Sequence, residues 1–155
     1  AAACLIATQP VAHRFGLSLL AQPVAATTAM EPNPIHSEAV SVGQGLSAVV
    51  RDIINRLPQQ ELISLTYCDL NGERYRNEEF GYTLLRTQHG FRDAHDYLTP
   101  ADCWGDMGAA SGILFIILAI QSKLRGYAKG PLPICWAGSE SGQRAAVLLN
   151  LRAEG

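Results

Sequence analysis

Three short polar segments hold the groups with which this chain could do chemistry. Together they supply two thiols, two carboxylates, an amide and a small-residue turn with two hydroxyls. The members are Cys68, Asp69 and Asn71, then Cys103 and Asp106, then Gly138, Ser139, Ser141 and Gly142. A thiol can act as a nucleophile, a carboxylate can move a proton, and the N–H groups of a glycine turn can stabilise charge on an oxygen. We therefore treat these nine positions as candidate site residues.

The two carboxylates also have structural interpretations. Asp69, Asn71 and Gly72 together favour a tight turn, with glycine at the position that needs a positive φ. Asp106 precedes an apolar run, where it can cap a helix by accepting a hydrogen bond from the Ala109 N–H. We expect a turn at Asp69 and a cap at Asp106, and we keep both residues as candidates for lining one cleft.

The four cysteines form no CxxC pair, so zinc-finger, redox and haem motifs are absent. They are Cys4, Cys68, Cys103 and Cys135. We expect reduced thiols in a cytoplasmic protein. Nothing near Cys68 in the sequence activates it, which favours packing over nucleophilic attack, whereas Cys103 lies near a helix start that can lower a thiol pKa. His89 and His95 have no metal-ligand spacing, so we expect neither a metal nor a cofactor.

The composition is that of a globular domain with a sizeable core. Of the 155 residues, 48% are hydrophobic and 17% are charged, and the formal net charge is −2. This balance excludes a basic footprint for nucleic acid. The longest apolar run, residues 109–120, is shorter than the ~20 residues that a membrane span needs. We interpret that run as a buried helix and expect no membrane association.

The hydrophobic pattern predicts nine elements that position these residues. We expect strands at residues 2–8, 17–28, 61–67, 132–137 and 144–151, and helices at 10–15, 43–57, 75–88 and 106–125. The residues between 89 and 103 read as a loop, and the last two strands as a hairpin with a five-residue tip at 138–142. This order predicts one α/β domain over residues 1–155, in which helices cover a mixed sheet.

Two of the predicted helices carry specific expectations about burial. The small-residue turn GDMGAASG at 105–112 lets the backbone approach another segment, and the apolar run after it predicts a central helix that is buried almost all round. In the helix at 75–88 we expect Phe80, Leu84 and Leu85 to point inward.

The order of these motifs resembles the C-terminal half of β-ketoacyl-acyl carrier protein synthases, a family of the thiolase superfamily. AAACLIA at the start is similar to the strand that closes the N-terminal half in that family, and GQGL at 43–46 to the start of the helix that follows. The segment 67–79 resembles the loop with the first catalytic His, and GDMGAASG the loop with the second. GSESGQRAAVLL at 138–149 resembles the gating loop and last strand. The resemblance implies one half of a thiolase-like layered fold, with the N-terminal half missing.

The resemblance implies acyl-thioester chemistry, from which this sequence departs at the key positions. Members of the family join acyl units with a Cys nucleophile, which lies in the N-terminal half, and two His. The first His position falls at Cys68 or Asp69 and the second at Asp106, so neither His is present. Ser139, Glu140 and Ser141 stand where the gating loop has an aromatic residue. A carboxylate repels a developing oxyanion unless it is protonated.

Two functions follow from the resemblance, and a third does not need it. The first is a β-ketoacyl synthase-like acyltransferase fragment for condensation of the fatty acid or polyketide type, with Asp69 and Asp106 at the catalytic positions. The other candidate residues then line the substrate pocket: Cys68, Asn71, Cys103, Gly138, Ser139, Ser141 and Gly142. The second is a non-catalytic thiolase-fold subunit, which the absent His pair favours. The third is an unrelated α/β ligand-binding domain.

The implied partners are an N-terminal half of the same fold and an acyl carrier protein or coenzyme A thioester. Half of such a core exposes its inner apolar face, so we also expect a homo- or hetero-oligomer.

Overall fold

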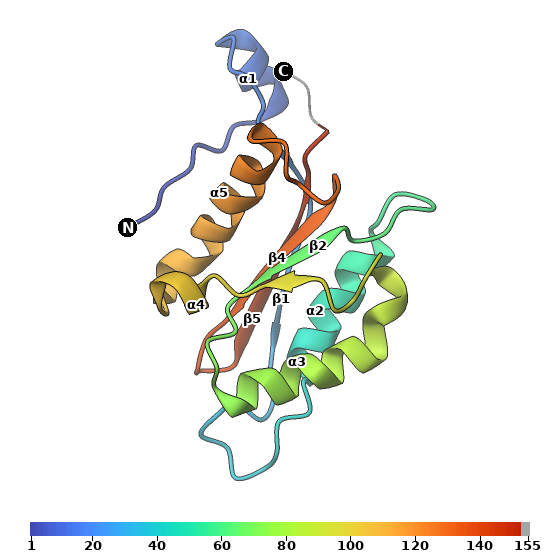
Figure 1. The fold of residues 1–155 in the computed structure, drawn as a ribbon, viewed down its shortest axis with the longest axis vertical. Coiled ribbons are helices and arrows are strands. Elements are labelled where there is room, and N and C mark those ends of the chain that lie inside the picture. The colour runs from blue at the N-terminus through green and yellow to red at the C-terminus, as the bar shows by residue number, and fades with distance from the viewer. Residues whose placement is uncertain (153–155) are drawn as a thin grey trace.

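A mixed sheet with helices on both faces forms the framework of residues 1–152, which a computed structural model describes (Figure 1). Its strands are β1 (Gln22–Met30), β2 (Leu65–Cys68), β3 (Tyr97–Leu98), β4 (Pro133–Gly138) and β5 (Gln143–Asn150). The helices are α1 (Gln9–Arg14), α2 (Gln44–Asn55), α3 (Arg74–Thr87), α4 (Ala101–Trp104) and α5 (Ser111–Leu124). Short 3-10 turns at Gln88–Gly90 and Gly108–Ala110 follow α3 and precede α5.

The strand order β1-β5-β4-β2-β3 decides which loops meet. β2 runs parallel to both β3 and β4, whereas β5 is antiparallel to β4 and β1. The carboxyl ends of parallel strands lie at one edge of a sheet. The segments after β2, β3 and β4 therefore leave the sheet at the same edge.

One face of the sheet is covered by α2 and α3 (Figure 1). The apolar positions of α2 follow the spacing that predicted the helix, and Leu46, Val49, Val50 and Ile53 are all buried. They belong to one cluster with sheet residues such as Leu148. In α3, Phe80 is buried as expected, but Leu85 is 74% exposed. The buried face of this helix consists mostly of polar residues instead, namely Arg76, Glu79, Thr83 and Thr87.

The other face is covered by α5, and here the expected burial is wrong. Phe115 and Ala119 pack against Tyr67, Cys135 and Leu149 of the sheet. Only four α5 residues are buried, namely Ser111, Phe115, Ala119 and Ser122. The helix has a sheet on one side alone, so the rest of its apolar surface stays partly exposed.

The sequence pattern also placed several boundaries wrongly. Residues 1–8 form no strand and instead run beside α5, where residues 3–7 face Ile116, Ile117 and Ile120 across a cavity (Figure 1). β1 begins at Gln22 rather than at residue 17. α5 begins at Ser111 rather than at residue 106, because Gly105 and Gly108 have φ values of 77° and 54° that break the helix. The expected loop at 89–103 contains β3 and α4.

Candidate functional site

Three segments meet at the carboxyl edge of the parallel strands, as the sheet order requires. They are the bend at 69–73 after β2, the turn at 105–110 before α5 and the tip at 139–142 between β4 and β5. The Asn71 amide Nδ2 donates to Asp106 Oδ2 at 3.1 Å, which joins the first two segments. The Gly138 N–H donates to Asp69 Oδ2 at 2.7 Å, which joins the bend to the tip. Four of the nine candidate residues therefore lie in one corner of the molecule, which we call the polar corner.

Asp69 is buried in an ion pair at the centre of the polar corner. Arg76, in the first turns of α3, donates from Nη1 to Asp69 Oδ2 at 2.7 Å and to the Asp69 carbonyl oxygen at 3.2 Å. The same guanidinium donates from Nε to Glu73 Oε2 at 2.8 Å. Burial raises the pKa of the Asp69 carboxyl, and the Gly138 N–H and Arg76 oppose that shift. The carboxylate therefore has structural partners within the chain.

Asp106 is less enclosed than Asp69. Its side chain is 43% exposed and lies 3.9 Å from Arg76 Nη2. Its Oδ1 accepts a hydrogen bond of 2.7 Å from the Gly108 N–H. The expected cap to the Ala109 N–H is thus wrong by one residue, because Gly108 turns the chain before α5 begins. Asp106 stabilises this turn and presents Oδ2 at the mouth of the polar corner.

The tip at 139–142 has the geometry of a tight hairpin. The Ser139 N–H donates to the Gln143 carbonyl at 2.9 Å, and the Gly142 N–H donates to the Ser139 carbonyl at 3.0 Å. Gly142 has a φ of 99°, which a side chain would strain. The Gly138 N–H donates to Asp69. The N–H groups of Gly138, Ser139 and Gly142 are therefore all bound within the chain and are not available to a ligand oxygen. Ser139 and Ser141 form a hydroxyl pair with an Oγ–Oγ distance of 2.7 Å.

The two candidate thiols lie in different environments. Cys68 is fully buried, and burial raises the pKa of its thiol to about 12. Its Sγ donates to the Leu98 carbonyl at 3.4 Å. At neutral pH Cys68 is therefore protonated and lacks the thiolate that a nucleophile needs. Cys103 is exposed on α4, a helix that precedes α5 rather than starting it.

A second buried ion pair, which the sequence reasoning missed, lies beside the polar corner. Arg144 donates from Nε and Nη2 to the two carboxylate oxygens of Glu79 at 2.7 and 2.8 Å. Both side chains are at most 4% exposed. Arg144 also donates to the Ser139 carbonyl at 2.9 Å, which holds the tip. The alternation of β5 could have indicated a buried Arg144, because this residue lies on the same inward face of the strand as Ala146 and Leu148.

Side chains fill the interior of the polar corner. The cavity that they leave has a volume of about 10 Å³. It is lined by Asp69, Tyr75, Arg76, Glu79, Trp136, Gly138 and Arg144. This is about the space of one water molecule, so no acyl group fits beside Asp69. Asp106, whose side chain is 43% exposed, is the more accessible of the two carboxylates.

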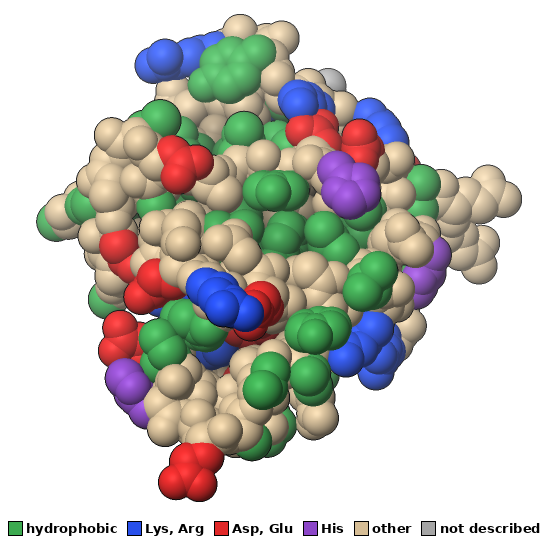
Figure 2. Space-filling view, turned by 60° about the horizontal axis from the view of Figure 1, so that its bottom comes forward, with side chains coloured by type: hydrophobic (Ala, Val, Ile, Leu, Met, Phe, Trp, Pro, Cys, Tyr) green, Lys and Arg blue, Asp and Glu red, His purple; other side chains and the backbone are tan. Residues whose placement is uncertain are grey.

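The face drawn in Figure 2 carries no large basic patch. On the face drawn in Figure 2, acidic and basic side chains are interspersed, with hydrophobic side chains between them. Within residues 1–152, no helix has the length and apolar character to cross a bilayer. The same residues hold no group of three or more His, Cys, Asp or Glu side chains arranged for a metal ion.

Comparison with known proteins gives matches in structure alone. No family model and no curated protein matches the sequence. An oxazolomycin ketosynthase domain from Streptomyces albus JA3453 matches with a TM-score of 0.70 at 12% identity, over 93% of this chain and 48% of that chain. A complex of a type II polyketide acyl-carrier protein with its ketosynthase bound to the hexaketide matches with a TM-score of 0.64 at 11% identity, over 92% and 37%. A thiolase from Ascaris suum, in complex with coenzyme A, matches with a TM-score of 0.59 at 16% identity, over 93% and 34%.

These matches show that the chain has the thiolase-like fold, which the sequence resemblance predicted. The chain spans less than half of the length of each of these solved chains. In this chain that fold consists of a mixed five-stranded sheet with helices on both faces.

Proposed function

We propose that this chain is the C-terminal half of a β-ketoacyl synthase-like protein and that it shapes an acyl-thioester pocket without supplying a catalytic group. The observation that carries the proposal is the closed polar corner. The resemblance gives the first His position to Cys68 or Asp69, and Asp69 is bound to Arg76 and to the Gly138 N–H. An imidazole donates to a thioester oxygen, whereas this carboxylate accepts two hydrogen bonds at Oδ2 and leaves Oδ1 buried without a partner, so it has no donor to offer while ionised.

The tip supports the same proposal. A gate that admits substrate has to move, but this tip is held from three sides. Asp69 accepts from Gly138, Arg144 donates to the Ser139 carbonyl, and the Glu31 N–H donates to the Gly142 carbonyl at 2.7 Å. We infer that Ser139, Ser141 and Gly142 form a fixed wall of the pocket rather than a mobile donor.

The partners in this proposal follow from the fold. An N-terminal half of the same fold supplies the Cys nucleophile, and the ligand is a thioester of an acyl carrier protein or of coenzyme A. Structural neighbours of the chain include a ketosynthase in complex with an acyl-carrier protein and a thiolase with coenzyme A, which supports this class of ligand. All four cysteines are free thiols, which supports a reducing compartment such as the cytoplasm.

The test uses the complete protein with an acyl coenzyme A thioester and the variant Asp106→Asn. A wall residue at the mouth affects how tightly the thioester binds, so we expect KM to change while kcat stays within about twofold. Intact-mass measurement of the wild type should place the acyl adduct on a Cys outside residues 1–155. Absence of any adduct or thioester binding would overturn the proposal.

A second candidate is a condensing half in which Asp106 itself reacts. The exposure of its side chain and the long distance to Arg76 favour this alternative. Here Asp106→Asn should lower kcat at least tenfold with little change in KM, which corresponds to ~1.4 kcal/mol in the transition state. The same measurement therefore separates the two candidates.

A further inference from the structure

Two buried side chains of the polar corner each hold one polar atom that has no hydrogen-bond partner among residues 1–152. The first atom is the indole Nε1 of Trp136, a residue that is 4% exposed. The second is Oδ1 of Asp69, which is 6% exposed, because Arg76 and the Gly138 N–H both donate to Oδ2. A buried donor or acceptor without a hydrogen bond is costly, and native proteins nearly always pair such groups with protein or with ordered water. Each of these two atoms therefore indicates a bound partner.

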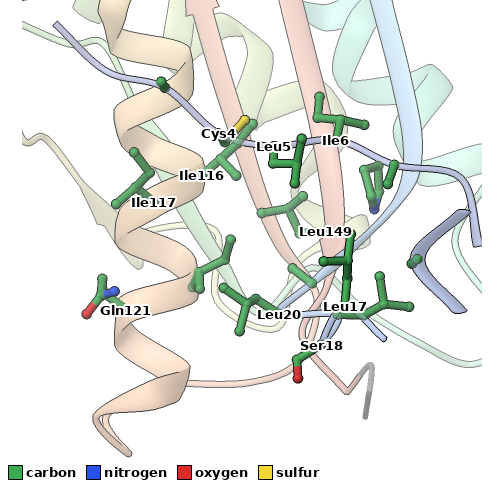
Figure 3. A pocket seen from close by; sticks show the side chains of 17 residues that line it. Cys4, Leu5, Ile6, Leu17, Ser18, Leu20, Ile116, Ile117, Gln121 and Leu149 are labelled. Atoms are coloured by element: carbon green, nitrogen blue, oxygen red, sulfur yellow. The ribbon is translucent and has the colours of Figure 1, made fainter. Parts of the chain in front are cut away.

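Both atoms belong to residues that line the same small cavity between α3 and the sheet. Its volume of about 10 Å³ is close to the ~10–15 Å³ that one water molecule requires. On the sheet side, Trp136 packs against Phe80 of α3, with 5.4 Å between the ring centroids. The larger cavity of about 440 Å³ beside α5 differs, because its lining is mostly apolar (Figure 3) and none of its described residues holds a buried polar atom without a partner. The unpaired donor and the unpaired acceptor therefore coincide at one place in the described chain.

The chemistry of these two atoms restricts what can occupy the small cavity. An indole N–H only donates, so the occupant needs a lone pair, which excludes an ammonium or sodium ion. An ionised carboxylate only accepts, so the occupant also needs a hydrogen to donate, which excludes a chloride ion. The volume excludes an alcohol, an amide or any larger group that carries both functions. Water satisfies all three conditions.

We propose that the polar corner binds one water molecule, which accepts a hydrogen bond from Trp136 Nε1 and donates one to Asp69 Oδ1. A buried water has about two to four polar partners, and Tyr75 also lines the cavity. The bridge fixes the plane of the Asp69 carboxylate, so that Oδ2 stays directed at the Gly138 N–H. Trp136 is then a positioning residue, because through the water it holds the carboxylate that binds the tip at 139–142. The inference rests on the cavity and its polar atoms, so it does not depend on the proposed function.

The first test locates the water in the complete protein. A high-resolution crystal structure should show a density peak at ~2.5–3.2 Å from both Trp136 Nε1 and Asp69 Oδ1. In solution, protein that is isotope-labelled at its tryptophan nitrogens should show a nuclear Overhauser effect between the Trp136 indole proton and water, with the sign of a long-lived bound molecule. An empty cavity, or an Nε1 that donates to a protein oxygen, would overturn the inference, and so would an indole proton with no such effect.

The second test asks whether the water positions the carboxylate. Trp136→Phe keeps an aromatic ring in the core but removes the donor of the bridge, so Asp69 should hold the tip less firmly. The Gly138 amide should then exchange with solvent deuterium about 2- to 10-fold faster, as expected for the loss of one net hydrogen bond. The Ser64 amide, which donates to a backbone carbonyl at the start of β2, gives the reference rate.

The matched control is Trp104→Phe, which changes an indole on α4 that does not line the cavity. It should leave the ratio of Gly138 to Ser64 exchange unchanged. An unchanged ratio in Trp136→Phe, or an equal rise in both variants, would contradict the positioning role. Neither readout involves acyl transfer or thioester binding, so failure here is separate from failure of the proposed function.

Discussion

Two buried ion pairs, Asp69 with Arg76 and Glu79 with Arg144, define this molecule at the scale of single residues. Both lie beside the sheet edge where the three loops meet. Buried pairs add little net stability over an apolar replacement, but losing one partner leaves the other charge buried and unpaired. We therefore expect them to hold the geometry of the polar corner more than they raise overall stability.

Removal of one charge from the inner pair should be strongly destabilising. Glu79→Gln leaves the Arg144 guanidinium buried without its carboxylate, which should lower the free energy of unfolding by about 3–5 kcal/mol. The neighbouring Glu78→Gln is the matched control, because Glu78 pairs with an exposed Arg74 and its loss should be small. Urea denaturation measures the free energy of unfolding of both variants. An equal loss in the two would show that the buried pair is no more important to stability than the exposed one.

The pKa of Asp69 makes stability depend on pH in a defined direction. Because burial raises this pKa above the ordinary 3.8, the folded protein holds the proton more tightly than the unfolded chain does. As pH rises from the ordinary value towards the raised one, the unfolded state loses its proton first, so the contribution of Asp69 to stability falls. Asp69→Asn should remove that fall. Unfolding free energies of both proteins, measured from about pH 3 to about pH 7, should differ in slope, and parallel curves would contradict the assignment.

At the residue scale, the sequence predicted features that depend on neighbouring residues in the chain, but it missed an ion pair that depends on tertiary contacts. Asp69, Asn71 and Gly72 predicted a turn because their preferences act within four residues, and Gly72 has a φ of 87°. The pairing of Glu79 with Arg144 joins residues 65 positions apart. Periodicity alone indicates that such residues face inward, but it cannot name the partner.

At the scale of elements, the placement of α2 depends on a close backbone approach at Gly45. A Cβ there would lie 2.7 Å from the Glu31 backbone nitrogen and 2.8 Å from its Cα. The Gly45 N–H also donates to Glu31 Oε2 at 2.7 Å, so α2 and the end of β1 are held together at this point. The atoms that such a Cβ would meet belong to the backbone of Met30 and Glu31, which cannot move aside as the end of a flexible side chain can.

Gly45→Ala should accordingly destabilise the fold by about 1–3 kcal/mol, because it forces α2 away from β1. Gly81→Ala in α3 is the control, since a Cβ at Gly81 meets nothing within 4 Å. The control should gain about 0.5–1 kcal/mol from better helix propensity. Thermal melts of the two variants should therefore move in opposite directions, and a melt of Gly45→Ala at or above the wild-type temperature would refute the close approach.

The elements with a strong internal pattern were predicted well, and the short ones were not. The spacing of Leu46, Val49, Val50 and Ile53 predicted α2 because the helix buries that stripe. β3 was missed because its two residues gain their strand geometry only by pairing with β2. Residues 1–8 read as a strand because they are apolar, but in the structure they pair with no strand of the sheet.

At the scale of the whole molecule, the thiolase-like fold is present while a large apolar surface stays open. The sequence resemblance predicted this fold correctly, from the order of its motifs rather than from any one of them. The apolar run at 109–120 predicted a helix buried almost all round, whereas only four residues of α5 are buried in the described chain. The partly exposed flank of α5 is therefore a surface on which further protein can pack.

The position of β5 in the sheet has a consequence for how the chain reaches this state. β5 follows every other strand in the sequence, yet it lies between β1 and β4. As the ribosome releases the chain from its N-terminus, β1 therefore emerges more than a hundred residues before its only neighbour. β1 therefore stays without its strand partner until β5 has been synthesised, and its backbone edges remain exposed during that interval.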